Sequence, residues 1–444
     1  MPEIQSSAPA SRLGRRRFLG LAGLTAAGIG APALAGCGGQ GTGSGKDRIV
    51  IGLVPDLAKL FKKPIAQYNA RRTTGKKVVL RTMSSDSGAY FDTMRTQLQA
   101  GADDIDVFMA DIMWGAQFAP SGWIADLSDR FTPAARKKFL TEGIKLNEFD
   151  GKIYAVPWTW DSGLLYYRKD LLESGGFDAP PETWDELQHM AEKVMKDQKV
   201  KNGLIFQGAD YEGGNQNGVE YIRSSGGDVL SQSGDSVKIT LDSAEALRGL
   251  SIERSMVTSG VAPEAVATFK EPECEKLFLA GDTVFCRNWI YMYGLLGDTT
   301  KTKLERAQVG VAEIPVARRG IDHVCLGGGW SLMVNANSAS QDEAWKLVEH
   351  LTGDERQKIF AKDGFLPTRP GLYTDPEVTK AQPVFELAKD AIEHTTTPPI
   401  TSVYSDMSLE MAKHFNSSLR GAEKPEDALE QLQVKLQKIA DESQ

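Results

Sequence analysis

Acidic and aromatic side chains that could act together recur at a few points of the chain. The members of this set are Asp111, Trp160, Asp161, Trp289 and Trp330. A carboxylate accepts charge-assisted hydrogen bonds from hydroxyl groups, and an aromatic ring offers a negative π face to apolar C–H groups. Together these side chains have the chemistry to hold a ring with hydroxyls around its edge and C–H bonds on its faces, as in a sugar.

Motifs for catalysis are missing from the sequence. There is no Gly-x-Ser-x-Gly elbow, no HExxH and no Walker motif, and the five histidines are scattered without metal-ligand spacing. We therefore expect a binding protein without catalytic residues, metal or cofactor. A secreted glycoside hydrolase stays open as the alternative, because it would also place two acidic residues and aromatic rings in a cleft.

An α/β framework is expected to position these residues, because short β-rich runs alternate with amphipathic stretches. The predicted strands are 48–54, 77–83 and 105–110, and the predicted helices are 57–70 and 90–100. Such alternation predicts a mainly parallel sheet with helices on both faces, and ligands of these folds sit beyond the strand ends or between domains. Asp111 follows a strand and would face such a site. Its alternative role is to cap the next turn, where Asp is also favoured.

Later segments give further local predictions. Thr183 and Glu186 have the spacing of a capping box, which predicts a helix that continues through Met195. Apolar residues at three- and four-residue spacing predict helices at 342–351 and 427–439. In contrast, the polar, glycine-interrupted segment 211–217 predicts a loop, with a ligand contact as the alternative to a plain surface loop. Its polar side chains include Tyr211, Glu212, Asn215 and Asn217.

The N-terminus has the pattern of an export signal. Arg15-Arg16-Arg17 precedes an uncharged, Gly/Ala-rich run at 20–35 that is too short and too rich in small residues for a comfortable membrane-spanning helix. The paired arginines resemble the twin-arginine export motif, and Leu34-Ala35-Gly36-Cys37 resembles a lipobox in which Cys37 is acylated. An uncleaved membrane anchor is the alternative interpretation.

Cleavage after residue 36 would leave a lipidated Cys37 and a Gly/Ser-rich, flexible tether through residue 46, on the outer face of the cell membrane. The mature chain would keep 47 basic and 58 acidic side chains, a net charge of −11. No basic stripe is available to displace phosphate counterions, so nucleic acid is not an expected partner. The length of the mature chain is enough for two domains.

Three cysteines follow Cys37, at positions 274, 286 and 325. An odd number leaves at least one thiol unpaired, and no CxxC spacing suggests zinc or redox chemistry. We expect three unrelated buried cysteines, with a Cys274–Cys286 bridge as the alternative.

The segment 154–172, YAVPWTWDSGLLYYRKDLL, resembles the signature of family 1 extracellular solute-binding proteins of ABC sugar importers. The trehalose/maltose-binding branch is the most similar group, and shorter supporting matches lie at 106–111, 281–284, 288–289 and 327–330. The resemblance extends from about Ile49 to about Phe415. It implies a periplasmic-binding-protein-like fold of two α/β lobes, joined by several crossovers and closing on a sugar in the cleft between them.

The resemblance also implies roles for individual residues. Asp161 matches a sugar-binding aspartate, and Trp160 holds the aromatic position before it. Trp289 matches a stacking tryptophan, although a core position is its alternative. Gly329-Trp330 matches a pair in which the glycine lets the backbone approach the sugar while the tryptophan stacks. Trp158, in contrast, is expected only to pack between the lobes.

Three further residues are weaker candidates. Asp86 follows the second predicted strand and could reach the ligand from the first lobe. Tyr404 ends a segment that carries a sugar-binding arginine in trehalose binders, but Pro398 stands at the matching position here. This departure weakens trehalose as the ligand, and Arg369 is a candidate to compensate for the missing arginine.

The expected lobe 1 comprises residues 47–156 and about 300–350, and lobe 2 comprises about 157–299 and 351–444. The expected protein is a monomeric lipoprotein that delivers a disaccharide such as trehalose or maltose, or another small oligosaccharide, to the permease subunits of an ABC transporter. A cell-surface lipoprotein that binds a partner without transport is the remaining alternative.

Overall fold

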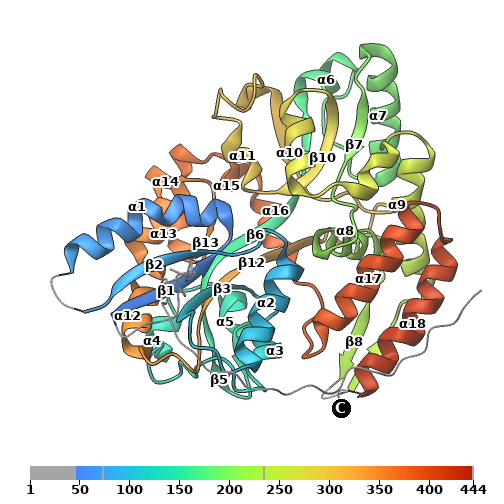
Figure 1. Cartoon of the computed structure of the whole chain (residues 1–444). Helices are drawn as coiled ribbons and strands as arrows, with labels where there is room; N and C mark the ends of the chain where they lie inside the picture. Colours follow the sequence, from blue (N-terminus) through green and yellow to red (C-terminus); the bar gives the residue numbers. More distant parts are fainter. Residues whose placement is uncertain (1–46, 73–74, 234–235, 443–444) are drawn as a thin grey trace, which may run out of the picture. The chain divides into compact units, whose positions relative to one another are not determined.

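The computed structural model describes residues 47–442 apart from 73–74 and 234–235 (Figure 1). The predicted export signal, Cys37 and the tether through residue 46 lie outside the described residues. The strands are β1 (Arg48–Leu53), β2 (Lys77–Thr82), β3 (Val107–Asp111), β4 (Glu148–Phe149), β5 (Lys152–Ile153), β6 (Ala155–Arg168), β7 (Asn202–Ile205), β8 (Leu230–Ser233), β9 (Ser236–Ile239), β10 (Thr283–Trp289), β11 (Val309–Ala312), β12 (Cys325–Val334), β13 (Leu366–Pro367) and β14 (Thr395–Thr396).

Helices alternate with these strands along the chain. The α-helices are α1 (Pro55–Arg71), α2 (Ser87–Gln99), α3 (Gly115–Phe118), α4 (Pro133–Arg136), α5 (Thr141–Lys145), α6 (Lys169–Ser174), α7 (Trp184–Gln198), α8 (Glu212–Arg223), α9 (Ala244–Thr258), α10 (Glu271–Leu279), α11 (Met292–Leu295), α12 (Gln341–Thr352), α13 (Asp354–Lys362), α14 (Pro376–Ala381), α15 (Val384–Leu387), α16 (Lys389–Glu393), α17 (Tyr404–Leu419) and α18 (Pro425–Glu442). The 3-10 helices are η1 (Glu264–Thr268), η2 (Arg306–Gln308) and η3 (Pro370–Thr374). Within the part of the chain that is described, none of them combines the length and apolarity needed to cross a membrane.

The central sheet has ten strands in the order β2-β1-β3-β12-β6-β10-β7, with β11 and β13 paired to β6 and β14 paired to β12. The strands β1, β2 and β3 are parallel, as predicted. The whole sheet is nevertheless mixed rather than mainly parallel, because β12 and β6 run antiparallel to each other, β12 runs antiparallel to β3, and β6 runs antiparallel to β10.

The long strand β6 connects the two halves of this sheet. Its first half, Ala155–Ser162, pairs with β12, and its second half pairs with β10 and β11. The conspicuous signature segment of the sequence is therefore a crossing strand. We call the elements around β2-β1-β3-β12 the first lobe and those around β10, β7 and β11 the second lobe.

Aromatic contacts mark the core of each lobe. In the first lobe, Phe61 of α1 lies 4.6 Å from Trp158 and 4.5 Å from Phe360 of α13, measured between ring centres. Trp158 is thus a packing residue, as expected, but it packs inside the first lobe. In the second lobe, Trp184 of α7 stacks on Tyr221 of α8 at 4.3 Å.

Most local predictions are confirmed. The strands and helices predicted up to residue 110 agree with β1, α1, β2, α2 and β3 to within three residues at each end. The capping box at α7 forms, since the Glu186 amide donates to Thr183 Oγ1 at 3.2 Å and the Thr183 amide donates to Glu186 Oε2 at 3.3 Å. These features depend on nearby residues, so the sequence pattern is enough to identify them.

The predicted loop at 211–217 is wrong, because residues 212–223 form the buried helix α8. Its glycines serve close packing. A Cβ on Gly214 would lie 2.0 Å from the carbonyl oxygen of Ala209, and a Cβ on Gly218 would lie 2.3 Å from the ring of Phe415 in α17. The small residues that suggested a loop instead allow α8 to pack between neighbouring segments.

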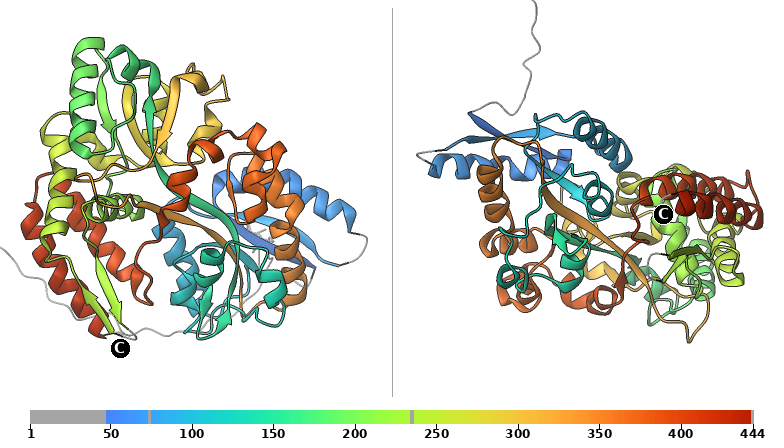
Figure 2. Two further views of the ribbon diagram at one scale, coloured as in Figure 1. Left: turned by 180° about the vertical axis from the view of Figure 1, so that it is seen from behind. Right: turned by 90° about the horizontal axis from the view of Figure 1, so that it is seen from below.

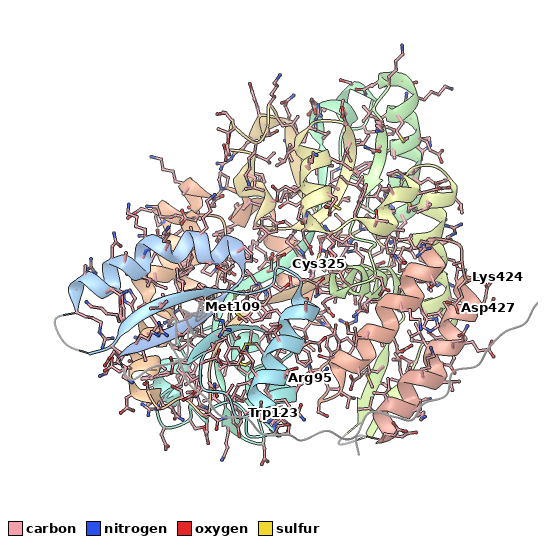
Figure 3. The ribbon with its side chains drawn as sticks, viewed as in Figure 1. Arg95, Met109, Trp123, Cys325, Lys424 and Asp427 are labelled. Atoms are coloured by element: carbon pink, nitrogen blue, oxygen red, sulfur yellow. The ribbon has the colours of Figure 1, made fainter. Side chains whose placement is uncertain are left out.

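The three cysteines of the described body, Cys274, Cys286 and Cys325, are buried and free, which excludes the Cys274–Cys286 bridge in this state. Cys325 begins β12 in the interior (Figure 3). Burial raises the pKa of its thiol to about 12, so the side chain is an inert core group at neutral pH.

Candidate ligand-binding site

Strand register brings the predicted site residues together where β6 and β12 pair side by side. In β12, Gly328 lies opposite Asp161, Gly329 lies opposite Trp160, and Trp330 lies opposite Asp111 at the end of β3. Trp289, the last residue of β10, lies opposite Gly163 in β6. Residues more than two hundred positions apart in the sequence therefore become neighbours.

A cavity of about 290 Å³, here named the tryptophan cavity, opens beside these paired strands. Its walls come from both lobes. Six predicted site residues line it, namely Asp111, Trp160, Asp161, Trp289, Gly329 and Trp330. Tyr211 and Glu212, the weaker candidates from the supposed loop, line it as well.

The tryptophan cavity is also lined by residues that no sequence pattern singled out as ligand contacts, among them Gln216, Glu271, Tyr291 and Phe365. Tyr291 follows Trp289 by two positions, so its proximity to the matched tryptophan was a usable signal. Gln216 was hidden inside the segment taken for a loop. Glu271 at the start of α10 and Phe365 before β13 have no local pattern that separates them from surface or core residues.

Asp161 is held by backbone amides. Its Oδ1 accepts hydrogen bonds from the amides of Ser162 at 2.9 Å and Ile290 at 3.2 Å, which orients the other carboxylate oxygen for a ligand. Burial raises the pKa of Asp161 to about 7, in spite of these bonds. A hydroxyl donor from a ligand would favour the ionised form.

Asp111 caps a turn and also lines the cavity. Its Oδ1 accepts from the amide of Met113 at 3.0 Å, which stabilises the turn that follows β3, and its side chain also lines the tryptophan cavity. Burial, and then the negative charge of Glu212, raises the pKa of Asp111 to about 7. The pair of carboxylates therefore favours hydroxyl or cationic donors between them.

Charged groups hold the ring of Trp289 in place. The guanidinium carbon of Arg287 lies 4.0 Å from the centre of its ring, and the indole Nε1 donates to Glu271 at 3.2 Å. Arg287 is itself held by Glu220 through two hydrogen bonds of 2.7 and 2.8 Å. This buried ion pair sets the orientation of the ring that lines the cavity.

The glycines before Trp330 differ in role. Gly329 has a φ of +151°, and a Cβ there would lie 2.3 Å from the carbonyl oxygen of Thr159. A glycine is therefore required for β12 to approach β6 this closely. A Cβ on Gly328, in contrast, would meet nothing within 4 Å, and Gly328 lines the cavity. The open space is thus next to Gly328. The sequence had instead suggested Gly329 as the glycine that makes room for a ligand.

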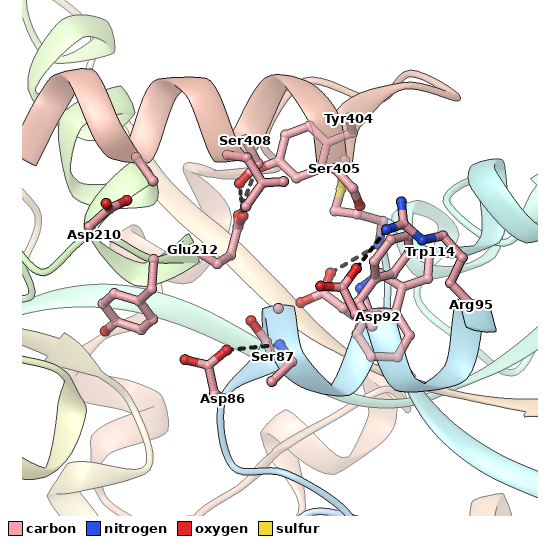
Figure 4. A pocket seen from close by; sticks show the side chains of 18 residues that line it. Asp86, Ser87, Asp92, Arg95, Trp114, Asp210, Glu212, Tyr404, Ser405 and Ser408 are labelled. Carbon is pink, nitrogen blue, oxygen red and sulfur yellow. Dashed lines mark hydrogen bonds and ion pairs between the residues drawn. The ribbon is translucent and has the colours of Figure 1, made fainter. Parts of the chain in front are cut away.

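A second cavity of about 300 Å³, here named the acidic cavity, adjoins the first (Figure 4). Both cavities are lined by Ser87, Asp111, Tyr211 and Glu212. Glu212 accepts hydrogen bonds from Tyr404 Oη at 2.6 Å and from the Ser408 hydroxyl, both in α17, and burial raises its pKa. The predicted residue Tyr404 therefore lies in the acidic cavity and orients a carboxylate.

Asp86 also lines the acidic cavity, where it has two structural partners. Its Oδ1 accepts from the amide of Ala89 at 2.9 Å and so caps α2. Its Oδ2 lies 2.6 Å from Nζ of Lys270, which belongs to the second lobe. The Lys270 ammonium helps to hold the pKa of Asp86 below its usual value.

The structure does not bring Arg369 to either cavity. Its Nη2 donates to the carbonyl oxygen of Thr352 at 2.8 Å, and its guanidinium carbon lies 3.7 Å from the ring centre of Phe139. Arg369 follows β13, which pairs with β6, and its side chain packs within the first lobe. It therefore does not compensate for an arginine at position 398.

Known proteins are similar to this chain over most of its length. A family model described as bacterial extracellular solute-binding protein matches residues 54–358. A probable ABC transporter-binding protein of Deinococcus radiodurans is 35% identical over 377 residues, which cover 83% of this chain and 88% of the relative. The maltotriose-binding protein of Pyrococcus abyssi is 24% identical over 367 residues, 80% of this chain and 74% of the relative.

Among solved structures, maltose-bound T. maritima MalE3 superposes with a TM-score of 0.82 at 32% sequence identity. The match covers 88% of this chain and 99% of that structure. It confirms the predicted two-lobe α/β fold.

Proposed function

The chain belongs to the bacterial extracellular solute-binding proteins, and we propose that it binds a neutral disaccharide or small oligosaccharide in the tryptophan cavity for an ABC importer. One observation carries this proposal. Two aspartates with pKa values near 7 and three tryptophans line a single cavity to which both lobes contribute. A ligand that contacts both lobes would favour the closed arrangement, which would then dock to the permease.

The charge of the tryptophan cavity narrows the ligand class. Four carboxylates line it, from Asp111, Asp161, Glu212 and Glu271, and no lysine or arginine is among the described lining residues. A phosphorylated or carboxylated sugar would meet these carboxyl groups without a lysine or arginine among the described lining residues to pair with its own charge. The cavity therefore suits hydroxyl donors and disfavours anions.

Maltose is the first ligand to test. The T. maritima structure contains maltose, and the Pyrococcus abyssi relative is named for maltotriose. Trehalose is disfavoured, because Pro398 replaces the expected arginine. Arg369 does not substitute for it, since its side chain packs within the first lobe. We infer binding rather than hydrolysis, since the relatives and the similar structure are binding proteins of transporters.

We further infer that Cys37 carries a lipid anchor that tethers a monomer to the outer face of the membrane. The lipobox-like sequence before Cys37 supports this inference. Metabolic labelling with a radioactive or alkynyl fatty acid should tag the protein, and Cys37→Ser should abolish the label. Labelling that persists in Cys37→Ser would refute the anchor.

The contacts also support different lobe boundaries from those predicted. β11 pairs with the second-lobe half of β6, whereas α13 and β13 contact first-lobe residues. We therefore propose that residues 309–312 belong to lobe 2 and that residues 341–375 belong to lobe 1. Hydrogen exchange with and without ligand would reveal which segments are protected together.

A thermal-shift screen of the mature chain against mono-, di- and trisaccharides tests the proposed function. A ligand that binds only the native state adds about 2.7 kcal/mol at a hundredfold excess over Kd. We expect a shift with maltose or a maltooligosaccharide, recovery of the sugar unchanged, and no shift with maltose phosphate. Consumption of the sugar would instead support the hydrolase, and no shift with any saccharide would refute sugar binding.

A further inference from the structure

A third cavity of about 480 Å³, here named the hinge cavity, lies beside the crossing strand β6. Elements α5, η3, α15, α16 and β14 contribute its other walls. In the view from behind, orange helices lie on the side of the sheet turned away from the viewer of Figure 1 (Figure 2, left), and α16 among them contacts β6. Trp160 lines both the hinge cavity and the tryptophan cavity, so its side chain lies between the two cavities.

Apolar rings form the inner wall of the hinge cavity. Trp160, Tyr373 and Phe385 line it, and the rings of Tyr373 and Phe385 lie 5.7 Å apart between centres. The hydroxyl of Tyr373 donates to the carbonyl oxygen of Pro367 at 2.9 Å. Because this bond fixes the phenol, the ring of Tyr373 is a rigid wall.

Charged groups lie at the rim of the cavity instead of inside it. Glu142, Glu386 and Glu393 line it and are exposed, with Lys389 as the one cation among the described lining residues. Lys389 lies 3.9 Å from Glu393, and Lys145 lies 2.9 Å from Glu142, so two of the three rim glutamates are paired. Among the described residues, Glu386 has no ion-pair partner and adds a net negative charge. The rim is therefore negative and would repel an anion.

We propose that the hinge cavity is a second binding site, which takes an organic cation with a flat apolar ring. The ring lies among Trp160, Tyr373 and Phe385, and the ammonium group lies at the carboxylate of Glu386. Aromatic faces and carboxylates both attract a cation. A sugar fits less well, because its hydroxyls would face the apolar inner wall, whereas a cationic amphiphile matches both the wall and the rim.

Two probes of the same ring and opposite charge test this proposal. Tryptamine carries an ammonium group on an indole, and indole-3-propionate carries a carboxylate. Both are titrated calorimetrically into the mature chain with Gly328→Val, in which the new side chain occupies the tryptophan cavity. We expect one tryptamine site and binding of the anion weaker by roughly tenfold or more.

Variants of α15 then locate the site. Phe385→Ala should abolish tryptamine binding, and Glu386→Lys, a surface change that leaves the core intact, should weaken it by roughly tenfold. Leu387→Ala is the matched control, because Leu387 is 55% exposed and does not line the cavity. The proposal would be overturned if tryptamine did not bind, if the anion bound with equal affinity, or if Glu386→Lys left the affinity for tryptamine unchanged. These outcomes do not depend on which sugar the protein binds.

Discussion

At the residue scale, two adjacent glycines of β12 have different physical duties. Gly328→Val should weaken sugar binding by roughly tenfold or more, because the side chain enters the ligand space while a β-branched residue suits a strand. Gly329→Ala should lower the free energy of unfolding by roughly 1–3 kcal/mol. Its positive φ is strained for alanine, and the added Cβ would collide with the carbonyl oxygen of Thr159. Calorimetric titration and chemical denaturation measure the two effects. Normal affinity in a folded Gly328→Val variant would place the ligand elsewhere.

The cavity carboxyls predict how affinity depends on pH. Burial raises the pKa of Asp111 and Asp161 to about 7, so both are largely protonated in the empty cavity at pH 5. A sugar hydroxyl that donates to a carboxylate must then displace a proton. Affinity for a neutral sugar should rise between pH 5 and pH 8, by roughly tenfold or more.

The control for this pH dependence is Asp161→Asn, which removes one titrating group. Its affinity should be lower at pH 8 and should vary less with pH. A wild-type affinity that stays constant from pH 5 to pH 8 would show that neither carboxyl changes ionisation on binding.

At the element scale, α8 depends on glycine for its position. Alanine is favoured over glycine in a helix by about 1 kcal/mol. Gly218→Ala should nevertheless lower the free energy of unfolding by roughly 1–3 kcal/mol, because its Cβ would lie 2.3 Å from the ring of Phe415. Gly371→Ala is the control, since nothing lies within 4 Å of a Cβ there. Denaturation midpoints compare them, and a stabilised Gly218→Ala would contradict the packing account.

Helix α9 contains an acidic residue in the core of the second lobe. Glu253 is 2% exposed, and its Oε2 has no hydrogen-bond partner within the described part of the chain. Burial raises its pKa to about 8. Above the ordinary pKa of a glutamate, the unfolded chain releases this proton while the folded chain keeps it. The free energy of unfolding should therefore fall as the pH rises from the ordinary pKa of Glu253 to about 8.

Glu253→Gln removes this titration while keeping the shape of the side chain. It should raise the free energy of unfolding at pH 7 by roughly 1–3 kcal/mol and flatten its dependence on pH. Urea denaturation between pH 5 and pH 8 measures both quantities. An equal pH slope in the variant and the wild type would assign that slope to other groups.

At the scale of the whole described body, the ion pair between Asp86 and Lys270 links the two lobes beside the acidic cavity. Both side chains are more than a third exposed, and exposed pairs contribute about 0.2–1 kcal/mol. Lys270→Met should therefore favour the open arrangement and weaken ligand binding by roughly two- to fivefold. The difference from wild type should shrink at high salt.

Lys301→Met is the matched control, because Lys301 pairs with Glu275 inside the second lobe. Small-angle scattering with and without sugar would follow closure. Identical affinities for Lys270→Met and Lys301→Met at low salt would show that the Asp86–Lys270 pair does not affect closure.

The sequence by itself determined the features that depend on neighbouring residues. The periodic strands and helices up to residue 110 and the capping box of α7 are local patterns, and the folded chain retains them. The sequence also predicted the chemistry of the proposed site, because carboxylates and tryptophans are groups suited to a polyhydroxylated ring. Their convergence on one ligand was expected only through resemblance to a family.

Tertiary structure decided which of these residues meet. The register of β12 against β6 and β3 places Gly328 at the open space of the tryptophan cavity and Gly329 at the close approach to Thr159. A shift by one residue would exchange those positions. Likewise, the glycines of α8 leave room for Phe415 and Ala209 to pack closely against this buried helix. The side chain of Arg369 contacts Thr352 and Phe139 instead of a cavity. Each of these outcomes depends on partners distant in sequence, so no local pattern contains them.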